Sequence, residues 1–379
     1  MATIPIAVPG TPPTRYDVVV EPGALSRLGM LVTAAAPAAR YAVLADERVA
    51  RLYGDVVCTA LARAGARADL VPFAAGEARK TVATWAELCD ALVRLGVGRD
   101  GCIIALGGGV TGDVAGFVAA TYLRGIDFVQ VPTTLLAMVD ASVGGKTGVD
   151  TPAGKNLVGA FHQPRLVVAD PDVLASLPEA ELRAGLVEAV KHGVIADAAY
   201  LERTVRDAAA ILRRDAAVLG ALVARSVEIK AEVVAEDPRE AGRRATLNFG
   251  HTIGHALEAL SGYELSHGYA VAAGMVAEAT IGEAVGVTAP GTASAIREAL
   301  GALGVPTAWP EWAAPDAVLA RSRHDKKVRA GQVRYSLVAR VGEAARTADG
   351  AWTHPVPDTV AAQALASLAR ATPFRLGGM

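Results

Sequence analysis

The first 170 residues alternate short apolar, β-branched runs with segments of helical periodicity. Five runs have the length and composition of buried strands: 16–20, 41–45, 68–73, 101–106 and 128–131. Helical patterns such as 83–95 separate them. Strands that alternate with helices in this way form a parallel sheet with helices on its faces. We therefore predict an α/β domain over residues 1–170.

The pattern changes after about residue 170, where long segments rich in Ala, Leu, Glu and Arg carry apolar side chains every three to four positions. The clearest such segments are 180–195, 200–236, 247–260 and 267–285. This periodicity is typical of amphipathic helices. Residues 332–341 have the pattern of a late strand. We predict a second, mostly α-helical domain over residues 171–379.

Composition narrows the class of protein. Of the 379 residues, 52% are hydrophobic and 20% are charged, so the chain can bury the cores of two domains. The formal net charge of −2 lacks the basic excess on which nucleic-acid binding depends. The N-terminus carries several prolines and no basic n-region like that of a signal peptide, and no apolar run reaches the length of a membrane span. We expect a cytoplasmic globular protein that binds neither nucleic acid nor membrane.

Lys and Asn are scarce in this chain. Only seven of the 37 basic residues are Lys, and the two Asn are Asn156 and Asn248. Where Arg supplies most of the positive charge, a remaining Lys tends to stand where a compact ammonium is needed. Codon bias with chance retention is the alternative for any one of them. The Lys and Asn positions are therefore candidates for a functional site.

A glycine-rich turn, 107–113, joins a predicted strand to an apolar helical segment. Glycines allow close backbone approach, and the amide groups at the start of a helix can bind a pyrophosphate. A turn that is glycine-rich for steric reasons alone is the alternative, and we favour nucleotide binding. Asp46, just past the second predicted strand, could accept ribose hydroxyls, although a surface Asp is the commoner explanation.

A second glycine-rich stretch follows the fifth predicted strand. Its polar residues are Thr133, Thr134, Asp140, Lys146, Lys155 and Asn156. Ammonium and amide donors among small residues suit the recognition of phosphate and hydroxyl groups. A solvated loop is the alternative, but such loops rarely carry so few charges. We favour a binding site.

Three of the seven His residues lie within residues 251–267: His251, His255 and His267. Arg244 and Asn248 precede them at the same spacing of three to four residues. This spacing places the side chains from Arg244 to His255 on one face of a helix, if the helix begins by Arg244. A stripe of imidazoles beside a guanidinium and a scarce Asn favours a site over a solvated face.

Glu188 and Lys191 lie one turn apart on another predicted helix, among apolar neighbours. A surface ion pair is the ordinary explanation of this spacing, and the apolar context favours a buried site instead. One Glu and two His form a plausible catalytic set for zinc, which leaves further positions open for substrate oxygens or water.

Together these motifs resemble the sugar phosphate cyclases, and most closely the 3-dehydroquinate synthase family. The similarity runs from about Tyr16 to beyond Tyr335. Its densest blocks include GGGVTGD at 107, GKNLVGAFHQP at 154, LPEAELRAGLVEAVKHG at 177, LNFGHTIGHALE at 247 and HDKK at 324. The resemblance implies a Rossmann-like NAD-binding α/β domain over residues 1–170, followed by a mostly helical domain over residues 171–379 that binds metal and substrate.

The resemblance also implies roles for individual residues. One divalent metal, zinc or cobalt, would be bound by Glu188, His251 and His267. NAD would contact Asp46, Glu77, Lys80, Gly108, Gly109, Val110, Asp113, Thr133, Thr134, Lys146, Lys155, Val173, Leu174, Ala175 and Ser176. Substrate binding and catalysis would fall to Arg124, Asp140, Lys146, Asn156, Lys191, Lys230, Glu240, Arg244, Asn248, His255 and one of Lys326 and Lys327. Of these, Glu240 and His255 match positions with proton-transfer roles.

The implied reaction converts 3-deoxy-D-arabino-heptulosonate 7-phosphate to 3-dehydroquinate and phosphate, a step of the shikimate pathway toward aromatic amino acids. It combines transient oxidation by NAD, elimination of phosphate, re-reduction and an intramolecular aldol reaction, so NAD is not consumed. The resemblance further implies a homodimer in which Arg124 reaches the phosphate site of the neighbouring subunit.

Other interpretations stay open. A related cyclase would act on sedoheptulose 7-phosphate or on an amino-substituted form of the keto acid. Arg244 and Lys230 favour a substrate with a carboxylate, because unpaired cations in a closed site are costly. An NAD- and metal-dependent polyol dehydrogenase would not need so many phosphate-binding Lys residues. Ala75 and Tyr269 depart from the usual family residues, Asp and Glu, so cofactor affinity and the metal surroundings could differ in detail.

Overall fold

Six parallel strands form the central sheet of the N-terminal half. The computed structural model describes residues 15–323, 333–371 and 373–374. The strands are β1 (Asp17–Val20), β2 (Tyr41–Asp46), β3 (Ala68–Phe73), β4 (Cys102–Gly107), β5 (Asp127–Pro132) and β8 (Leu166–Ala169). Their order across the sheet is β1-β8-β5-β4-β2-β3, and every adjacent pair is parallel.

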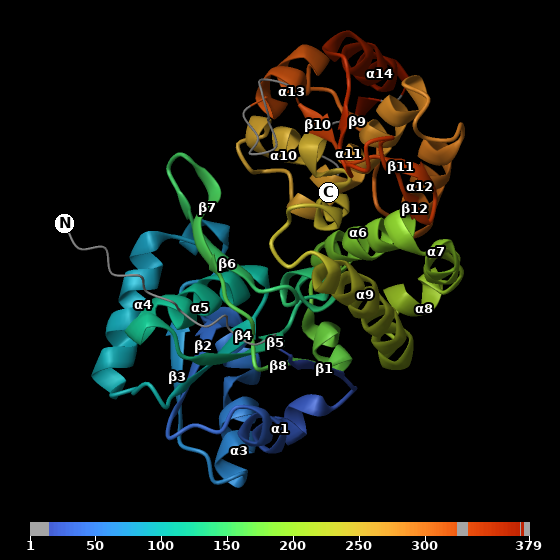
Figure 1. The fold of residues 1–379 in the computed structure, drawn as a ribbon. Helices are drawn as coiled ribbons and strands as arrows, with labels where there is room; N and C mark the ends of the chain where they lie inside the picture. The colour runs from blue at the N-terminus through green and yellow to red at the C-terminus, as the bar shows by residue number, and fades with distance from the viewer. Residues whose placement is uncertain (1–14, 324–332, 372, 375–379) are drawn as a thin grey trace, which may run out of the picture.

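Helices cover both faces of this sheet, as Figure 1 shows. They are α1 (Leu28–Ala35), α3 (Asp55–Arg63), α4 (Val82–Leu95) and α5 (Gly109–Thr121). Successive strand residues point to opposite faces. Val43 joins the apolar core that includes α1 and α3, whereas the next residue, Leu44, joins the core that includes α4 and α5. Burial on both faces explains why the strands are continuously apolar instead of alternating.

Shorter elements connect these strands and helices. They are η1 (Ala24–Arg27), α2 (Glu47–Val49), η2 (Ala50–Gly54), η3 (Glu77–Arg79), η4 (Tyr122–Arg124), η5 (Ala137–Ala141) and η6 (Pro171–Ser176). Between η5 and β8 the chain forms an antiparallel hairpin of β6 (Lys146–Thr151) and β7 (Gly154–Phe161). Figure 1 shows the hairpin, in green, rising away from the sheet.

The C-terminal half is mostly helical. Its helices are α6 (Glu179–Ala196), α7 (Ala198–Arg206), α8 (Ala208–Leu212), α9 (Ala216–Glu236), η7 (Arg243–Asn248), α10 (His251–Leu260), α11 (His267–Ala284), α12 (Thr292–Ala302), α13 (Pro315–Ser322) and α14 (Asp358–Ala371). Short strands accompany them: β9 (Trp309–Pro310), β10 (Arg334–Tyr335), β11 (Val338–Arg340), β12 (Glu343–Ala344), β13 (His354–Pro355) and β14 (Pro373–Phe374). Within the part of the chain that the structure describes, none of the helices combines the length and apolar character that a membrane crossing requires.

The α/β fold class and all five predicted strands are confirmed. The segment predicted to be helical over 200–236 is confirmed as helical but is divided into α7, α8 and α9. Asp207 and Asp215 each precede a new helix, and Arg214 between them adopts a left-handed backbone conformation, with φ of 62°. The strand expected over 332–341 is divided into β10 and β11. The glycine-rich stretch that contains Lys146 and Asn156 forms a hairpin, and β8 was not anticipated.

The contact between α10 and α11 depends on glycines. A Cβ atom at Gly274 would lie 2.0 Å from the carbonyl oxygen of Gly250 and 2.8 Å from the amide nitrogen of Gly254. Such distances are far below van der Waals contact, so a side chain at Gly274 would force the two helices apart. Because His251 directly follows Gly250, this contact also fixes the position of His251.

We predict that Gly274→Ala destabilises the fold by about 1–3 kcal/mol or more, the usual range for overpacking a buried contact. Gly301→Ala is the matched control, because Gly301 is also helical but has no atom within 4 Å of an added Cβ. The control should be neutral or slightly stabilising, since Ala favours helix by about 1 kcal/mol. Thermal unfolding of both variants checks this, and equal melting temperatures would contradict it.

Candidate functional site

The carboxyl ends of β2 and β4 lie side by side in the sheet, where the strand order reverses. Ala45 pairs with Leu106, which places Asp46 next to the Gly107–Gly109 turn. In open α/β sheets, ligands bind outside the carboxyl ends of the strands at such a reversal point. One carboxylate oxygen of Asp46 accepts from the amides of Arg48 and Val49, 3.0 Å from each, so this side chain caps α2.

The turn after β4 leaves the first amides of α5 without a side-chain cap. The N-cap residue of α5 is Gly108, which has no side chain to accept from the first amides of the helix. A Cβ at Gly107 would lie 2.4 Å from the Thr111 hydroxyl oxygen, so only glycine fits there. The buried hydroxyl of Thr133 has no hydrogen-bond partner within the residues that the structure describes. These features fit the binding of a dinucleotide pyrophosphate.

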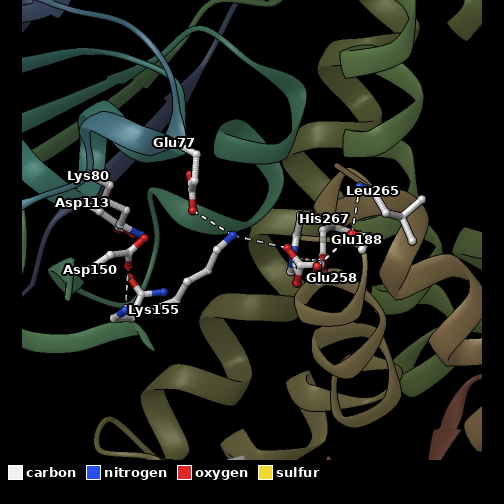
Figure 2. Close-up of polar contacts among 11 residues, drawn as sticks. Glu77, Lys80, Asp113, Asp150, Lys155, Glu188, Glu258, Leu265 and His267 are labelled. Carbon is white, nitrogen blue, oxygen red and sulfur yellow. Dashed lines mark hydrogen bonds and ion pairs between the residues drawn. The ribbon is translucent and has the colours of Figure 1, made fainter. Parts of the chain in front are cut away.

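Charged residues predicted to contact the cofactor pair with each other around this turn. The Lys80 ammonium lies 2.5 Å from the Asp113 carboxylate, and the Lys155 ammonium lies 3.0 Å from Glu77. On η6, Val173 and Leu174 are buried, whereas Ala175 and Ser176 are exposed. The Ser176 hydroxyl lies 2.7 Å from the Tyr53 hydroxyl. Figure 2 shows the first two pairs.

Glu188 and Lys191 on α6 form a buried ion pair, with both side chains only 1% exposed. Burial raises the pKa of a carboxyl group, but the Lys191 ammonium and His251 outweigh it and hold the pKa of Glu188 well below its usual range. One of its oxygens, Oε2, contacts the Lys191 ammonium. Glu188 is therefore an ionised carboxylate whose other oxygen, Oε1, lies on the side of two imidazole rings.

Three His rings surround that carboxylate. The Nε2 atoms of His251 and His267 lie 3.6 and 3.5 Å from Glu188 Oε1. The ring centres of His251 and His255 are 5.3 Å apart. The expected helix through Arg244 is wrong, because Gly250 has φ of 81°, so α10 begins only at His251.

Glu188, His251 and His267 could hold a metal, since their ligand atoms lie within 4.8 Å of one another. Burial, aided by Lys191, lowers the pKa of His251, so this ring is neutral at pH 7 as metal binding requires. Burial alone would lower the pKa of His267, but hydrogen bonds to Glu188 and Glu258 raise it to about 10. The second group of this kind among the described residues, His255, Glu258 and His267, shares one ring.

Asp140 connects the sheet half to this cluster. The Lys230 ammonium on α9 lies 2.7 Å from Asp140 Oδ1 and donates to its backbone carbonyl at 2.5 Å. His192 Nε2 lies 3.6 Å from the same carboxylate oxygen. Burial would raise the pKa of Asp140, but Lys230 and Lys191 hold it well below its usual range. Asp140 is therefore ionised at neutral pH.

A second polar group lies around Glu240. Its carboxylate contacts the Lys146 ammonium and accepts from Asn248 Nδ2 at 2.6 Å. Arg244 is almost fully buried, with 1% of the residue exposed. Its terminal nitrogens donate to the carbonyl oxygens of Pro238 at 2.7 Å and Gly144 at 2.9 Å.

Some predicted residues lie apart from these groups. Arg124 is exposed, and Arg124 and Leu123 both have positive φ, of 68° and 50°. Asn156 is exposed on β7, where its backbone amide donates to the Asp150 carboxylate at 2.7 Å. Lys326 and Lys327 lie outside the described residues.

Sequence reasoning missed several residues that the fold brings to the site. Glu258 contacts His267, His192 contacts Asp140, and the Tyr16 hydroxyl accepts from the amide of Gly144 at 3.1 Å. Glu258 could have been found, because it lies three residues after His255 and seven after His251, on the same helical face. The buried His192 could also have been found, because it is one of only seven His residues in the chain and directly follows Lys191.

A separate cavity of about 850 Å³ lies beyond α9, lined by residues such as Ile229, Arg243, Trp352 and His354. None of the predicted site residues lines it. The charged cluster, and not this cavity, is therefore the candidate active site.

Known proteins are similar to this chain in both sequence and fold. Family models described as 3-dehydroquinate synthase N-terminal and C-terminal match residues 70–184 and 185–328. The 3-dehydroquinate synthase of Symbiobacterium thermophilum is 50% identical over 337 residues, which are 88% of this chain and 94% of the relative.

Two solved cyclases have the same architecture. The 2-epi-5-epi-valiolone synthase of Streptomyces hygroscopicus subsp. jinggangensis, solved with NAD+ and Zn2+, has a TM-score of 0.85 at 28% identity and covers 96% of this chain and 99% of its own. A 2-deoxy-scyllo-inosose synthase, solved with carbaglucose-6-phosphate, NAD+ and Co2+, has a TM-score of 0.83 at 28% identity and covers 93% of this chain and 96% of its own.

The fold and the buried His–Glu cluster define the class, which is that of the sugar phosphate cyclases. Within that class, the chain belongs to the 3-dehydroquinate synthase family. The resemblance of the sequence motifs to this family is thus confirmed.

We predict that His251→Ala and His267→Ala each lose bound metal and activity, because a three-ligand site loses its geometry with one ligand. His255→Ala should keep the metal while the reaction is impaired, since His255 belongs only to the second group of ligand atoms. Elemental analysis of the purified variants measures this. Metal kept by His251→Ala and lost by His255→Ala would assign the metal to His255, Glu258 and His267 instead.

Proposed function

We propose that the chain converts 3-deoxy-D-arabino-heptulosonate 7-phosphate to 3-dehydroquinate and phosphate. Relatives that are about half identical over most of their length carry the name of this activity. The buried groups described above supply ionised carboxylates, ammonium groups and imidazoles to a substrate with hydroxyl, phosphate and carboxylate groups.

The buried guanidinium of Arg244 is the observation that favours a substrate with a carboxylate. Its terminal nitrogens donate to backbone carbonyls, and its buried Nε has no hydrogen-bond partner among the described residues. Burial lowers the pKa of Arg244, although the charges of Glu240, Asp140 and Asp237 oppose this shift. An anionic substrate group would offset that cost. A keto acid has such a carboxylate, whereas sedoheptulose 7-phosphate does not.

The other cations are held by acidic partners that fix their positions. Lys230 is held by Asp140 and Lys191 by Glu188, so both ammonium groups are oriented in a buried setting. Lys146 is half-exposed and paired with Glu240, which leaves it able to turn toward an arriving phosphate. Fixed cations around an anionic substrate bind and orient it before reaction.

The residues present fit the two groups that the family uses. When bound, NAD takes up and returns a hydride, and a divalent metal polarises a substrate oxygen. We propose that zinc or cobalt is held by Glu188, His251 and His267, and that the pyrophosphate of NAD lies at the Gly108 end of α5. These placements are supported by the convergence of Glu188 Oε1 with Nε2 of His251 and His267, and by the Thr133 hydroxyl, which has no hydrogen-bond partner in the described part of the chain.

Glu240 is suited to accept a proton. Burial would raise its pKa, but contact with Lys146 and the hydrogen bond from Asn248 lower it. The carboxylate is therefore ionised at neutral pH and held in a fixed orientation. We assign proton transfer to Glu240 and to His255, which stands beside His251.

We also propose a division between an NAD-binding domain, 1–170, and a metal- and substrate-binding domain, 171–379. The sheet ends at β8, and the residues proposed as metal ligands lie on α6, α10 and α11. We propose a homodimer as well. Exposed apolar side chains of β7, Leu157, Val158 and Phe161, support it, because such side chains commonly lie in interfaces.

The activity test compares two substrates. The wild type should release phosphate from the keto acid phosphate with catalytic NAD and without net NADH, and it should prefer this substrate to sedoheptulose 7-phosphate. Arg244→Ala should cost about 2–5 kcal/mol in kcat/KM on the keto acid, the range for losing one partner of a buried charged pair. Arg244→Lys should be less impaired, since it keeps the charge but not the paired hydrogen bonds.

Arg243→Ala is the matched control. Arg243 precedes Arg244 but pairs with Glu236 at 2.5 Å on the outer side of the helix, so its loss should leave the substrate preference unchanged. The dehydroquinate proposal fails if the wild type prefers sedoheptulose 7-phosphate, or if Arg244→Ala leaves the preference as it was. Net NADH formation from a polyol would favour a dehydrogenase.

Arg124 should act across the subunit interface. We expect Arg124→Ala and Lys191→Ala to be inactive alone, and a refolded equal mixture to regain up to about a quarter of wild-type activity, because each mixed dimer contains one intact site. Analytical ultracentrifugation at the assay concentration should give a dimer. An active monomer, or a mixture without recovered activity, would contradict the shared site.

A further inference from the structure

Glu258 on α10 contacts two residues that matter to different parts of the site. Its Oε2 lies 3.2 Å from Nδ1 of His267, a proposed metal ligand. Its Oε1 lies 3.4 Å from the ammonium of Lys155, a proposed cofactor contact. The Glu258 side chain is only 4% exposed. Figure 2 shows Glu258 between His267 and Lys155, with Glu188 beyond the imidazole.

The two nitrogens of the His267 ring face two different carboxylates. Nε2 lies 3.5 Å from Glu188 Oε1, and Nδ1 lies 3.2 Å from Glu258 Oε2. A neutral imidazole carries one proton, and an Nδ1–H that donates to a carboxylate leaves the Nε2 lone pair for a metal. In the neutral ring that metal binding requires, the contact with Glu258 therefore favours the Nδ1–H tautomer, whose Nε2 lone pair points toward Glu188.

Glu258 is better placed to orient His267 than to bind the metal itself. One of its oxygens faces His267 and the other faces Lys155, so both are engaged. Glu188, in contrast, has one oxygen on the Lys191 ammonium, and its Oε1 faces the Nε2 atoms of both His251 and His267. A metal bound by Glu258 would have to displace the imidazole or the ammonium, whereas Glu188, His251 and His267 already present ligand atoms to one another within 4.8 Å.

The charge of Glu258 is compensated from the other half of the molecule. Lys155 on β7 pairs with Glu258 and also with Glu77, 3.0 Å away at η3. Its ammonium lies 4.7 Å from the ring centre of Tyr263. A buried carboxylate without such a partner would be costly. Lys155 thus allows Glu258 to stay ionised next to the imidazole.

We propose that Glu258 is a positioning residue of the metal site, which holds the His267 ring through Nδ1 so that Nε2 is presented to the ion. This inference rests on the proposed function, in which His267 is a ligand. It gives a role to a residue that ends the LNFGHTIGHALE block but is absent from the roles that the resemblance assigns.

The test is metal affinity in the absence of substrate and NAD. Zinc and cobalt affinities of the purified wild type, Glu258→Leu and Glu258→Gln are measured by competition with a chromophoric chelator. Glu258→Leu should bind about 10–100-fold more weakly, the usual effect of losing a partner that orients a ligand. Glu258→Gln should fall between, because its amide oxygen still accepts from Nδ1–H but carries no charge.

The cobalt spectrum separates positioning from direct coordination. If Glu258 only orients His267, the cobalt-loaded variants keep the wild-type pattern of d–d bands once they are saturated. A changed pattern, with an affinity loss as complete as that of His251→Ala, would make Glu258 a ligand and overturn the proposal. Affinity equal to wild type in Glu258→Gln would overturn it too, even if Glu258→Leu fails to fold.

Glu283→Gln is the matched control. Glu283 lies near the far end of α11, the helix that begins at His267, and accepts from the amide of Ala293 at 2.8 Å. The substitution of Glu283 should leave metal affinity unchanged. If this control also bound metal more weakly, the Glu258 effect would be due to general destabilisation of the fold, which would overturn the proposal. A wild type that binds neither metal would contradict the proposed function itself, whereas normal wild-type binding with unaffected Glu258 variants contradicts only this inference.

Discussion

Glu188 and Lys191 are held on α6 with almost no exposure to water, and such a pair is tolerated only where neighbouring groups replace the lost hydration. On the Glu188 side, the rings of His251 and His267 supply this compensation. On the Lys191 side, the ionised Asp140 adds an attractive charge. The elements that carry these groups must therefore converge on one turn of α6, and the rest of the site follows from that convergence.

Glycines make this convergence possible at short range. A Cβ at Gly185 on α6 would lie 2.6 Å from the backbone nitrogen of Leu136, so α6 packs directly on the segment that leads into η5 and Asp140. A Cβ at Gly268 would lie 2.5 Å from the carbonyl oxygen of Ala184, which brings the start of α11, and with it His267, against the same helix. Backbone contacts of this kind tolerate little displacement, so the charged groups are held in position before any ligand arrives.

Local patterns predicted the elements because each one has a local cause. The buried strand 102–107 is apolar throughout, and the glycines of the turn that follows it are consecutive in the sequence. The scarcity of Lys also pointed to the site, since Lys80, Lys155, Lys191 and Lys230 are all in ion pairs at or near it.

The sequence alone could not predict features that depend on residues distant in the chain or on a single backbone angle. Periodicity extended a helix back to Arg244, but the left-handed Gly250 ends that pattern. Glu258 looked like an ordinary helical Glu, because its partner Lys155 lies 103 residues earlier in the chain. Pairing across such a separation is decided by how the two halves pack, and no local window of sequence contains it.

The charges around Glu188 also explain why the substrate should carry more than one negative group. Three cations of the site have a carboxylate partner: Lys146 contacts Glu240, Lys191 contacts Glu188 and Lys230 contacts Asp140, whereas Arg244 donates to backbone carbonyls. A divalent metal on Glu188 would add positive charge. Excess buried charge of one sign destabilises a closed site until a ligand of opposite sign enters. A phosphorylated keto acid brings two anionic groups, and a sugar phosphate without a carboxylate would leave Arg244 uncompensated.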